Sequence, residues 1–286
     1  MKVHASTVNR TDTATLLAHP FFARAMTGLM RPKMSVLGMN FAGEIDLLGD
    51  DVTRFGVGDP VFGVTPDVFG THAKYLCVPD GGAIANIPGS VPYHEAVVGE
   101  GAWYANGTTQ ILSEGQRCLI YGASRAIGTA AVQLAKARGA HVVAVVGTRH
   151  IDLPGALGAD RVVNYETEDF TALGETFDLV FDAVGKTSFV ECRHLLAKNR
   201  VYSATDLGPG WSNIILGMFY GATGSRRVRI PFPEDAPGFI QQLADLISRG
   251  KFQGVFDRRY PLDEVADAFR YVETGQKTGI VVVDVC

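Results

Sequence analysis

The feature that most constrains the fold is a strand–turn–helix–strand pattern across residues 117–149. Residues 118–121 form a short apolar run of the kind that makes a buried strand. Small and apolar residues then recur at helical spacing from Ala126, and Gly139 ends the helix. A second β-branched run, His141–Val146, follows. The unit therefore predicts an α/β fold built on a doubly wound, parallel Rossmann sheet.

The turn of this unit has the character of a dinucleotide site. Gly122 and Gly128 stand where the backbone must approach a pyrophosphate, and free N–H groups at the helix start would bind that anion. The glycine spacing alone is a weak signal, but its place between a strand and a helix strengthens it. The alternative is a packing unit that binds no nucleotide. The predicted cofactor-binding residues of the turn are Gly122, Ala123, Ser124, Arg125, Ala126, Ile127 and Gly128.

The end of the second strand indicates which nucleotide binds. An NAD site usually has Asp or Glu about twenty residues after the glycines, yet no carboxylate appears here before Asp152. Arg149 can instead pair with a 2′-phosphate, and Thr148 can donate a hydrogen bond to it. We therefore predict NADPH in preference to NADH. The alternative is that Arg149 is a solvated surface charge.

Length and composition restrict the class of protein. At 286 residues, of which 47% are hydrophobic, the chain suits about two domains. A net charge of −4 without basic runs argues against a nucleic-acid surface. No apolar run approaches the ~20 residues that span a bilayer, so we predict no membrane partner. The four cysteines have neither metal nor disulfide spacing, which predicts reduced thiols in a cytoplasmic protein.

Strand and turn signals divide the chain into three segments. Short strands punctuated by Gly and Pro predict a small β-barrel in residues 1–92, with a loop at residues 19–35. Residues 93–232 hold the alternating strands and helices of the nucleotide-binding domain. Residues 233–286 end in an apolar strand that we expect to return to the first domain.

Four further elements are predicted from local pattern. They are a helix over residues 93–106, a strand over 72–78, a helix over 188–197 and a short basic strand over 226–230. The last of these would lie at the edge of the parallel sheet, where it either caps the sheet or pairs with a second subunit.

In this order, the segments resemble the medium-chain dehydrogenase/reductase superfamily over nearly the whole chain. The resemblance rests on VNRTD at residues 8–12, GMNFAGEIDLLGDDVTRFGVGDPVFG at residues 38–63, the nucleotide unit, and DLVFDAVG at residues 178–185. Within the superfamily the chain is most similar to the zinc-free, quinone oxidoreductase and zeta-crystallin-like branch. This implies a GroES-like catalytic domain, an NADP-binding Rossmann domain and a homodimer. Members usually carry about one more strand pair before the segment that matches Met1, so either the start is misassigned or the expected barrel is open at one edge.

The resemblance also bears on metal binding. Zinc-dependent relatives place Cys where this chain has Asn9, and His-Glu where it has Met39 and Asn40. Their third ligand is a Cys in the stretch that matches residues 98–101, which contains none. Because zinc needs three S, N or O ligands from the protein, we predict no metal. In the turn, Arg125 replaces a glycine common in relatives, and either contacts the pyrophosphate or points into solvent.

The resemblance assigns roles to further residues. Asn9 would lie near the nicotinamide and the substrate oxygen, while Asp12 is a catalytic candidate whose turn position favours a structural role. Lys277 is expected to be solvated, and the alternative is that it approaches a phosphate from the returning C-terminal segment. The remaining predicted cofactor contacts are Tyr165 at the adenosine, which is equally well a surface tyrosine, and Ala183, Val184 and Gly185 at the ribose.

These residues predict an NADPH-dependent, zinc-independent oxidoreductase that transfers hydride to a quinone or an α,β-unsaturated carbonyl. Such acceptors delocalise the developing negative charge, so positioning and hydrogen-bond donors suffice. Two alternatives stay open at this point. One is an NAD(P)-dependent alcohol dehydrogenase, and the other is a nucleotide-binding sensor or structural protein with little turnover.

Overall fold

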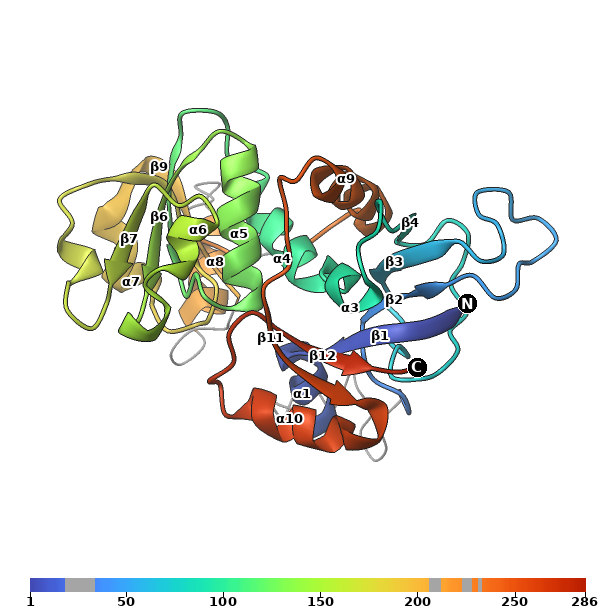
Figure 1. Ribbon diagram of the computed structural model, residues 1–286. Coiled ribbons are helices and arrows are strands. Elements are labelled where there is room, and N and C mark those ends of the chain that lie inside the picture. The colour runs from blue at the N-terminus through green and yellow to red at the C-terminus, as the bar shows by residue number, and fades with distance from the viewer. Residues whose placement is uncertain (19–33, 206–211, 223–227, 231–232) are drawn as a thin grey trace. The chain divides into compact units, whose positions relative to one another are not determined.

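The structure is a computed structural model, and it describes residues 1–18, 34–205, 212–222, 228–230 and 233–286 (Figure 1). The chain divides into two compact units. Unit 1 combines Met1–Glu100 with Asp235–Cys286, and unit 2 is Gly101–Glu234. The loop predicted at residues 19–35 lies almost entirely outside the described residues.

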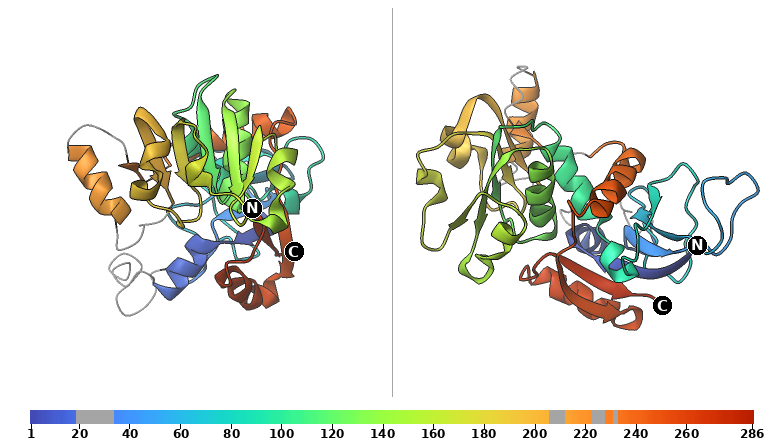
Figure 2. Two further views of the ribbon diagram at one scale, coloured as in Figure 1. Left: turned by 90° about the vertical axis from the view of Figure 1, so that its left-hand side faces the viewer. Right: turned by 45° about the horizontal axis from the view of Figure 1, so that its top comes forward.

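Unit 1 is built on one six-stranded sheet with the strand order β11-β12-β1-β2-β3-β4. Both chain termini lie in this unit (Figures 1 and 2). The first strand, β1, pairs with the last, β12, and Ala5 stands opposite Asp284. The strands are β1 (Lys2–Val8), β2 (Asn40–Glu44), β3 (Pro60–Val64), β4 (Ile84–Asn86), β11 (Phe256–Pro261) and β12 (Ile280–Asp284). The helices are α1 (Arg10–Leu17), α3 (Tyr93–Ala96), α9 (Ala236–Ser248) and α10 (Val265–Glu273).

The core of unit 1 follows from the amphipathic pattern of its elements. Helix α10 packs its buried residues, which include Phe269 and Val272, against β1, β11 and β12. Phe41 of β2 and Val283 of β12 are fully buried in the same cluster. Apolar side chains on one face of a strand or helix must find such a partner surface, which is why these elements assemble around one core.

Unit 2 is a six-stranded, all-parallel sheet with the order β10-β9-β8-β5-β6-β7. This is the doubly wound Rossmann order, in which the order reverses between β5 and β8, and it confirms the predicted fold class. The strands are β5 (Arg117–Tyr121), β6 (His141–Val146), β7 (Arg161–Asn164), β8 (Phe177–Asp182), β9 (Leu196–Ala204) and β10 (Val228–Arg229). The helices are α4 (Gly99–Thr109), which crosses the boundary between the units, α5 (Ala126–Ala137), α6 (Leu153–Ala156), α7 (Phe189–Cys192) and α8 (Ser212–Ala222).

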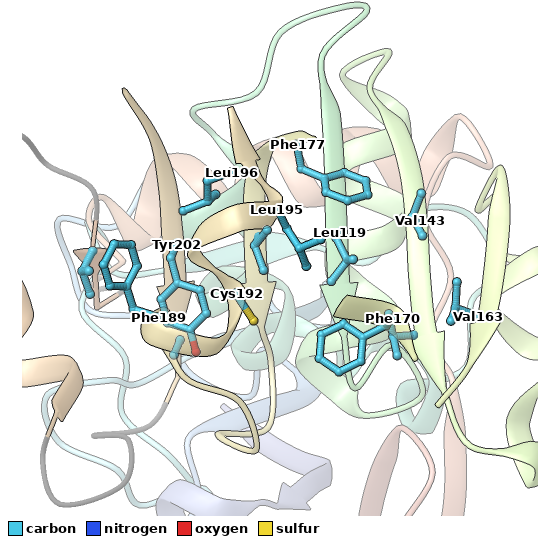
Figure 3. Packing of buried hydrophobic residues seen from close by; sticks show 14 residues of the cluster. Leu119, Val143, Val163, Phe170, Phe177, Phe189, Cys192, Leu195, Leu196 and Tyr202 are labelled. Carbon is cyan, nitrogen blue, oxygen red and sulfur yellow. The ribbon is translucent and has the colours of Figure 1, made fainter. Parts of the chain in front are cut away.

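Short 3-10 turns complete the described elements; they are η2 (Thr148–His150), η3 (Phe170–Ala172), η4 (Arg193–Leu195) and η6 (Leu262–Glu264). Figure 3 shows buried side chains from the strands of unit 2 packed in one cluster with side chains of α7, η3 and η4. Leu119, Phe177 and Tyr202 are fully buried there. Burying one side chain such as Phe177 contributes about 1.5–3 kcal/mol, and this packing holds the strand ends in fixed register.

Two predicted elements are wrong. Residues 72–78 form no strand, because their pairing with the start of β1 is limited to a single bridge, Lys2 with Tyr75. The helix predicted over residues 188–197 ends early, since β9 begins at Leu196 and pairs with β8. Pairing with a neighbouring strand overrode the local helical pattern.

Other predicted elements are modified or confirmed. The helix expected over residues 93–106 is two helices, α3 and α4, with Val97 and Val98 between them. The expected edge strand is β10, which pairs in parallel with β9. All four cysteines are free thiols. In the described part of the chain, no helix is long and apolar enough to cross a membrane.

Candidate active site

The turn after β5 has the geometry of a pyrophosphate cradle. Gly122 has a φ of 78°, and a Cβ atom there would lie 2.6 Å from Val184 Cγ1. A Cβ on Gly128 would meet the Gly122 carbonyl oxygen and would lie 2.8 Å from Ala123 Cα. Only glycine therefore lets α5 start so close to the strand end.

The first turn of α5 is open for an anion. Its N-cap is Arg125, which makes no side-chain cap hydrogen bond. The N–H groups of Ala126, Ile127 and Gly128 have no intrahelical acceptor, as at any helix start. Gly122 and Ala123 instead donate to the Val145 carbonyl oxygen of β6, at 3.0 and 3.3 Å. The described residues offer these N–H groups no acceptor, so the turn presents a row of donors at the positive end of the helix dipole.

The loop after β8 faces the same strand end and is held by one buried carboxylate. Asp182 Oδ1 accepts the N–H groups of Val184 and Gly185, at 3.0 and 2.8 Å, and the Ala183 N–H donates to Tyr121 O at 3.0 Å. The three N–H groups of residues 183–185 are therefore occupied. Any ribose contact from this loop would have to use carbonyl oxygens.

The end of β6 holds Thr148 and Arg149, and both side chains are exposed. Among the described residues, none forms a hydrogen bond or ion pair with the Arg149 side chain. Thr148 differs, because its hydroxyl donates to Glu166 Oε2 at 2.7 Å and accepts from Asn164 Nδ2 at 2.8 Å. Tyr165 is 48% exposed, and its ring lies 5.8 Å from that of Tyr121.

Glu166 is a site residue that the sequence analysis does not include. No carboxylate lies between the end of β6 and Asp152, but the structure supplies one from the end of the next strand. Parallel neighbours bring their carboxyl ends together at one edge of a sheet. A search that included the residues after β7 would have found it.

In unit 1, the predicted residues Asn9 and Asp12 open helix α1. Asn9 is the N-cap: its Oδ1 accepts the N–H groups of Thr11 and Asp12 at 2.7 and 3.2 Å. Asp12 completes the capping box, accepting the Asn9 N–H at 3.0 Å and the Gly38 N–H at 2.9 Å. Such reciprocal capping satisfies the free donors of the helix start.

Two further residues complete what we call the Asn9 cluster, which consists of Asn9, Asp12, Glu100 and Lys277. Asn9 Nδ2 donates to Glu100 Oε2. Asp12, Glu100 and Lys277 are 0%, 4% and 6% exposed, whereas Asn9 is only half-buried. The cluster is therefore a group of three buried ionisable side chains with one half-buried amide.

Lys277 is a correction to the sequence analysis, which expected a solvated lysine. Its Nζ donates to the Gly279 carbonyl oxygen at 2.9 Å, and its charge acts on both carboxyl groups of the cluster. Burial of an ammonium group is tolerated only near compensating charge. The carboxyl partners come from residues 177 or more positions earlier in the chain, so local sequence gave no indication of them.

Burial dominates the electrostatics of the cluster. It raises the pKa of Asp12 from 3.8 to about 7, against the two backbone hydrogen bonds that lower it. Burial and the neighbouring Asp12 carboxylate raise the pKa of Glu100 from 4.5 to about 8. The raised pKa favours the neutral acid form of Glu100 at neutral pH. Sequence analysis missed Glu100 too, although a lone carboxyl in the apolar stretch VVGEGAW was a usable signal.

These raised pKa values predict how stability changes with pH. Because the folded chain binds more protons than the unfolded chain between the ordinary and the raised pKa, the free energy of unfolding falls as pH rises. Burial lowers the pKa of His72 from 6.5. Below pH 6.5, His72 therefore makes the free energy of unfolding rise with pH. We expect urea unfolding above pH 6.5 to show a slope that Glu100→Gln flattens by about 1 kcal/mol per pH unit. Equal slopes in the two proteins would contradict this assignment.

The positions that matched zinc ligands are joined by hydrogen bonds instead. Asn9 donates to Glu100, and the Glu100 N–H donates to Asn40 Oδ1 at 2.7 Å. Asn40 Nδ2 in turn donates to Thr7 Oγ1 at 2.7 Å. In the described part of the chain, no three His, Cys, Asp or Glu residues are grouped to hold a metal ion. Two amides, one thioether at Met39 and one buried carboxyl do not fit a catalytic zinc ion.

Comparison with known proteins agrees with this geometry. Residues 1–98 match the family described as alcohol dehydrogenase GroES-like domain, and residues 157–283 match the family described as zinc-binding dehydrogenase. The mitochondrial NAD(P)H oxidoreductase RTN4IP1 of Mus musculus is 29% identical over 321 residues, covering 100% of this chain and 81% of that protein. The trans-enoyl reductase pgmF of Aspergillus terreus is 29% identical over 293 residues, covering 93% and 80%. The solved structure of the quinone oxidoreductase from Coxiella burnetii is 27% identical with a TM-score of 0.84, covering 100% and 89%.

The strand order and the glycine turn are those of dinucleotide-binding α/β proteins. The chain belongs to the medium-chain dehydrogenase/reductase superfamily, in its quinone oxidoreductase-like branch. The family predicted from the sequence motifs is thereby confirmed.

Proposed function

We propose that this protein is an NADPH-dependent, zinc-independent reductase of quinones or α,β-unsaturated carbonyl compounds. The observation that carries the proposal is the glycine turn with its free helix-start donors, beside an Arg149 side chain to which the described residues offer no partner. Relatives named as an NAD(P)H oxidoreductase, a trans-enoyl reductase and a quinone oxidoreductase support the reaction class.

The predicted cofactor residues other than Thr148, whose hydroxyl is bonded to Glu166 and Asn164, have roles in this proposal. The backbone of residues 122–128 would hold the pyrophosphate, and the exposed Arg149 would pair with the 2′-phosphate. Tyr165 would lie at the adenosine, and the carbonyl groups of Ala183, Val184 and Gly185 would lie at the ribose. When bound, NADPH supplies a hydride.

The protein's own contribution to chemistry would come from the Asn9 cluster. The Asn9 amide would donate a hydrogen bond to the acceptor oxygen as negative charge develops there, without changing its own charge. Asp12 would fix the helix start that carries Asn9. Zinc independence follows in this proposal from the amide and thioether side chains at positions 9, 39 and 40.

Arg149→Ala tests the cofactor assignment. We expect the KM for NADPH to rise about tenfold or more, because a charge-assisted contact to the phosphate is lost. The KM for NADH should stay within about twofold, since NADH has no group for this side chain. Steady-state oxidation of both nucleotides, with 1,4-naphthoquinone as acceptor and a chelator present, measures the ratio.

Glu166→Gln is the companion variant, because a carboxylate beside Thr148 opposes a 2′-phosphate. With NADPH as the cofactor, removing this charge should lower the KM for NADPH. If Glu166 instead accepts from a ribose hydroxyl, the same change raises the KM for NADH. A higher KM for NADH in Glu166→Gln, together with no effect of Arg149→Ala, would assign NADH and refute our cofactor proposal.

We further propose a cytoplasmic homodimer. Support comes from β10, a two-residue strand at the sheet edge, and from α8, where Ile215, Met218 and Phe219 are 60–72% exposed. Apolar surface beside an open strand edge favours association with another chain. The free thiols suit a reducing compartment. Sedimentation equilibrium measures the mass directly.

A further inference from the structure

The two ends of the Asn9 amide are held by different parts of the chain. Its Oδ1 accepts two N–H groups of α1, and its Nδ2 donates to Glu100, which lies 91 residues later. Turning the amide over would place N–H groups against the N–H groups of Thr11 and Asp12. The orientation of Asn9 is therefore set jointly by the helix start and by Glu100.

One donor of this amide is left over. An Asn amide carries two N–H groups, and Glu100 accepts only one. Among the residues that the structure describes, no other acceptor for Asn9 Nδ2 is present. Asn9 is half-buried whereas Glu100 is 4% exposed, so Asn9 is the more accessible of the two residues to a ligand.

We propose that Glu100 is a positioning residue for the reduction, an inference that rests on the proposed function. It fixes the Asn9 amide so that one N–H remains for the oxygen of the acceptor. Glu100 itself is held in place, since its backbone N–H donates to Asn40 Oδ1 at 2.7 Å. A donor whose orientation is set before the reaction stabilises developing charge without reorganisation.

The charge state of Glu100 matters for the same reason. The charged groups that face it are Asp12 from α1 and Lys277 from the segment before β12, and the Thr11 and Asn9 side chains donate hydrogen bonds to it. Burial raises the pKa of Glu100 to about 8. The neutral acid adds no negative charge near the acceptor oxygen, whereas the carboxylate formed at higher pH would oppose the charge that develops there.

Two variants separate positioning from simple packing. Glu100→Gln keeps a neutral group with a carbonyl oxygen that can accept from Asn9, whereas Glu100→Leu fills similar space without an acceptor. We expect Glu100→Gln to keep kcat within about threefold and to lose the fall in kcat above the Glu100 pKa. We expect Glu100→Leu to lower kcat about 100-fold while the KM for NADPH changes less than about twofold. The probes are 1,4-naphthoquinone and 3-penten-2-one, and Glu95→Gln, an exposed carboxyl of α3, is the matched control.

Three kinetic results would overturn the proposal. These are full activity in Glu100→Leu, an equal loss in both variants, or a fall in kcat at high pH that persists in Glu100→Gln. A second readout does not depend on turnover. In protein labelled with ¹⁵N at Asn side chains, the Asn9 amide should exchange its hydrogens slowly in the native chain and in Glu100→Gln, and faster in Glu100→Leu.

This NMR measurement keeps the two proposals apart. A native protein that oxidises NADPH with neither probe refutes the proposed function, and the exchange rates still decide whether Glu100 holds Asn9. Conversely, an active native protein whose Asn9 exchange is the same in all variants refutes the positioning role alone.

Discussion

Lys277→Met is expected to destabilise the protein by about 3 kcal/mol at pH 8, because it leaves the buried Asp12 and Glu100 carboxyls without their cation. At pH 5.5 both carboxyls are protonated in the folded chain, since burial raises the pKa of each. The loss should therefore be clearly smaller at the lower pH. Urea unfolding followed by circular dichroism at the two pH values measures both differences.

The control for this variant is Lys251→Met, which removes the same charge from an exposed position of the same unit. Exposed charges contribute little to stability, so we expect a change within about 0.5 kcal/mol. If Lys277→Met proves no more harmful at pH 8 than at pH 5.5, Lys277 does not compensate the carboxyl groups.

Gly128→Ala is expected to destabilise unit 2 by about 1–3 kcal/mol and to weaken binding of NADPH, the cofactor that we propose. The new Cβ would meet the Gly122 carbonyl oxygen and Ala123 Cα, which are backbone atoms that cannot rotate away. The start of α5 must then move from the strand end, and the donors of the cradle move with it. Differential scanning fluorimetry with and without NADPH reports both effects.

Gly155→Ala is the matched control, since a Cβ at this helical glycine has no heavy atom within 4 Å. Alanine is the better helix former by about 1 kcal/mol, so this variant should be as stable as the native chain or slightly more so. If Gly128→Ala keeps the native melting temperature and the native affinity for NADPH, then the turn accommodates a Cβ at this position and the predicted steric conflict is wrong.

The sequence by itself determined the nucleotide-binding half of this protein. Its strand, glycine turn and helix are local patterns. Gly122 is required by its backbone conformation and Gly128 by its close approach to Gly122, which lies only six residues earlier. The family also followed from contiguous motifs. Local signals failed where pairing decided the outcome, as for residues 72–78 and for the helix that β9 cuts short at Leu196.

Only the tertiary structure decided the electrostatics of the candidate site. Lys277 looks like an ordinary surface charge along the chain, because isolated charges are costly to bury and are normally solvated. Glu100 stands out only by its apolar neighbours, which do not indicate the residues that it contacts. Folding brings Glu100 and Lys277 to Asn9 and Asp12 from positions 91 and 268 residues after Asn9, and burial then shifts the carboxyl pKa values. Glu166 reaches Thr148 for a similar reason, since the ends of adjacent parallel strands converge in space. Periodicity reports which face of an element is buried, but it carries no information about which distant charges share a buried site.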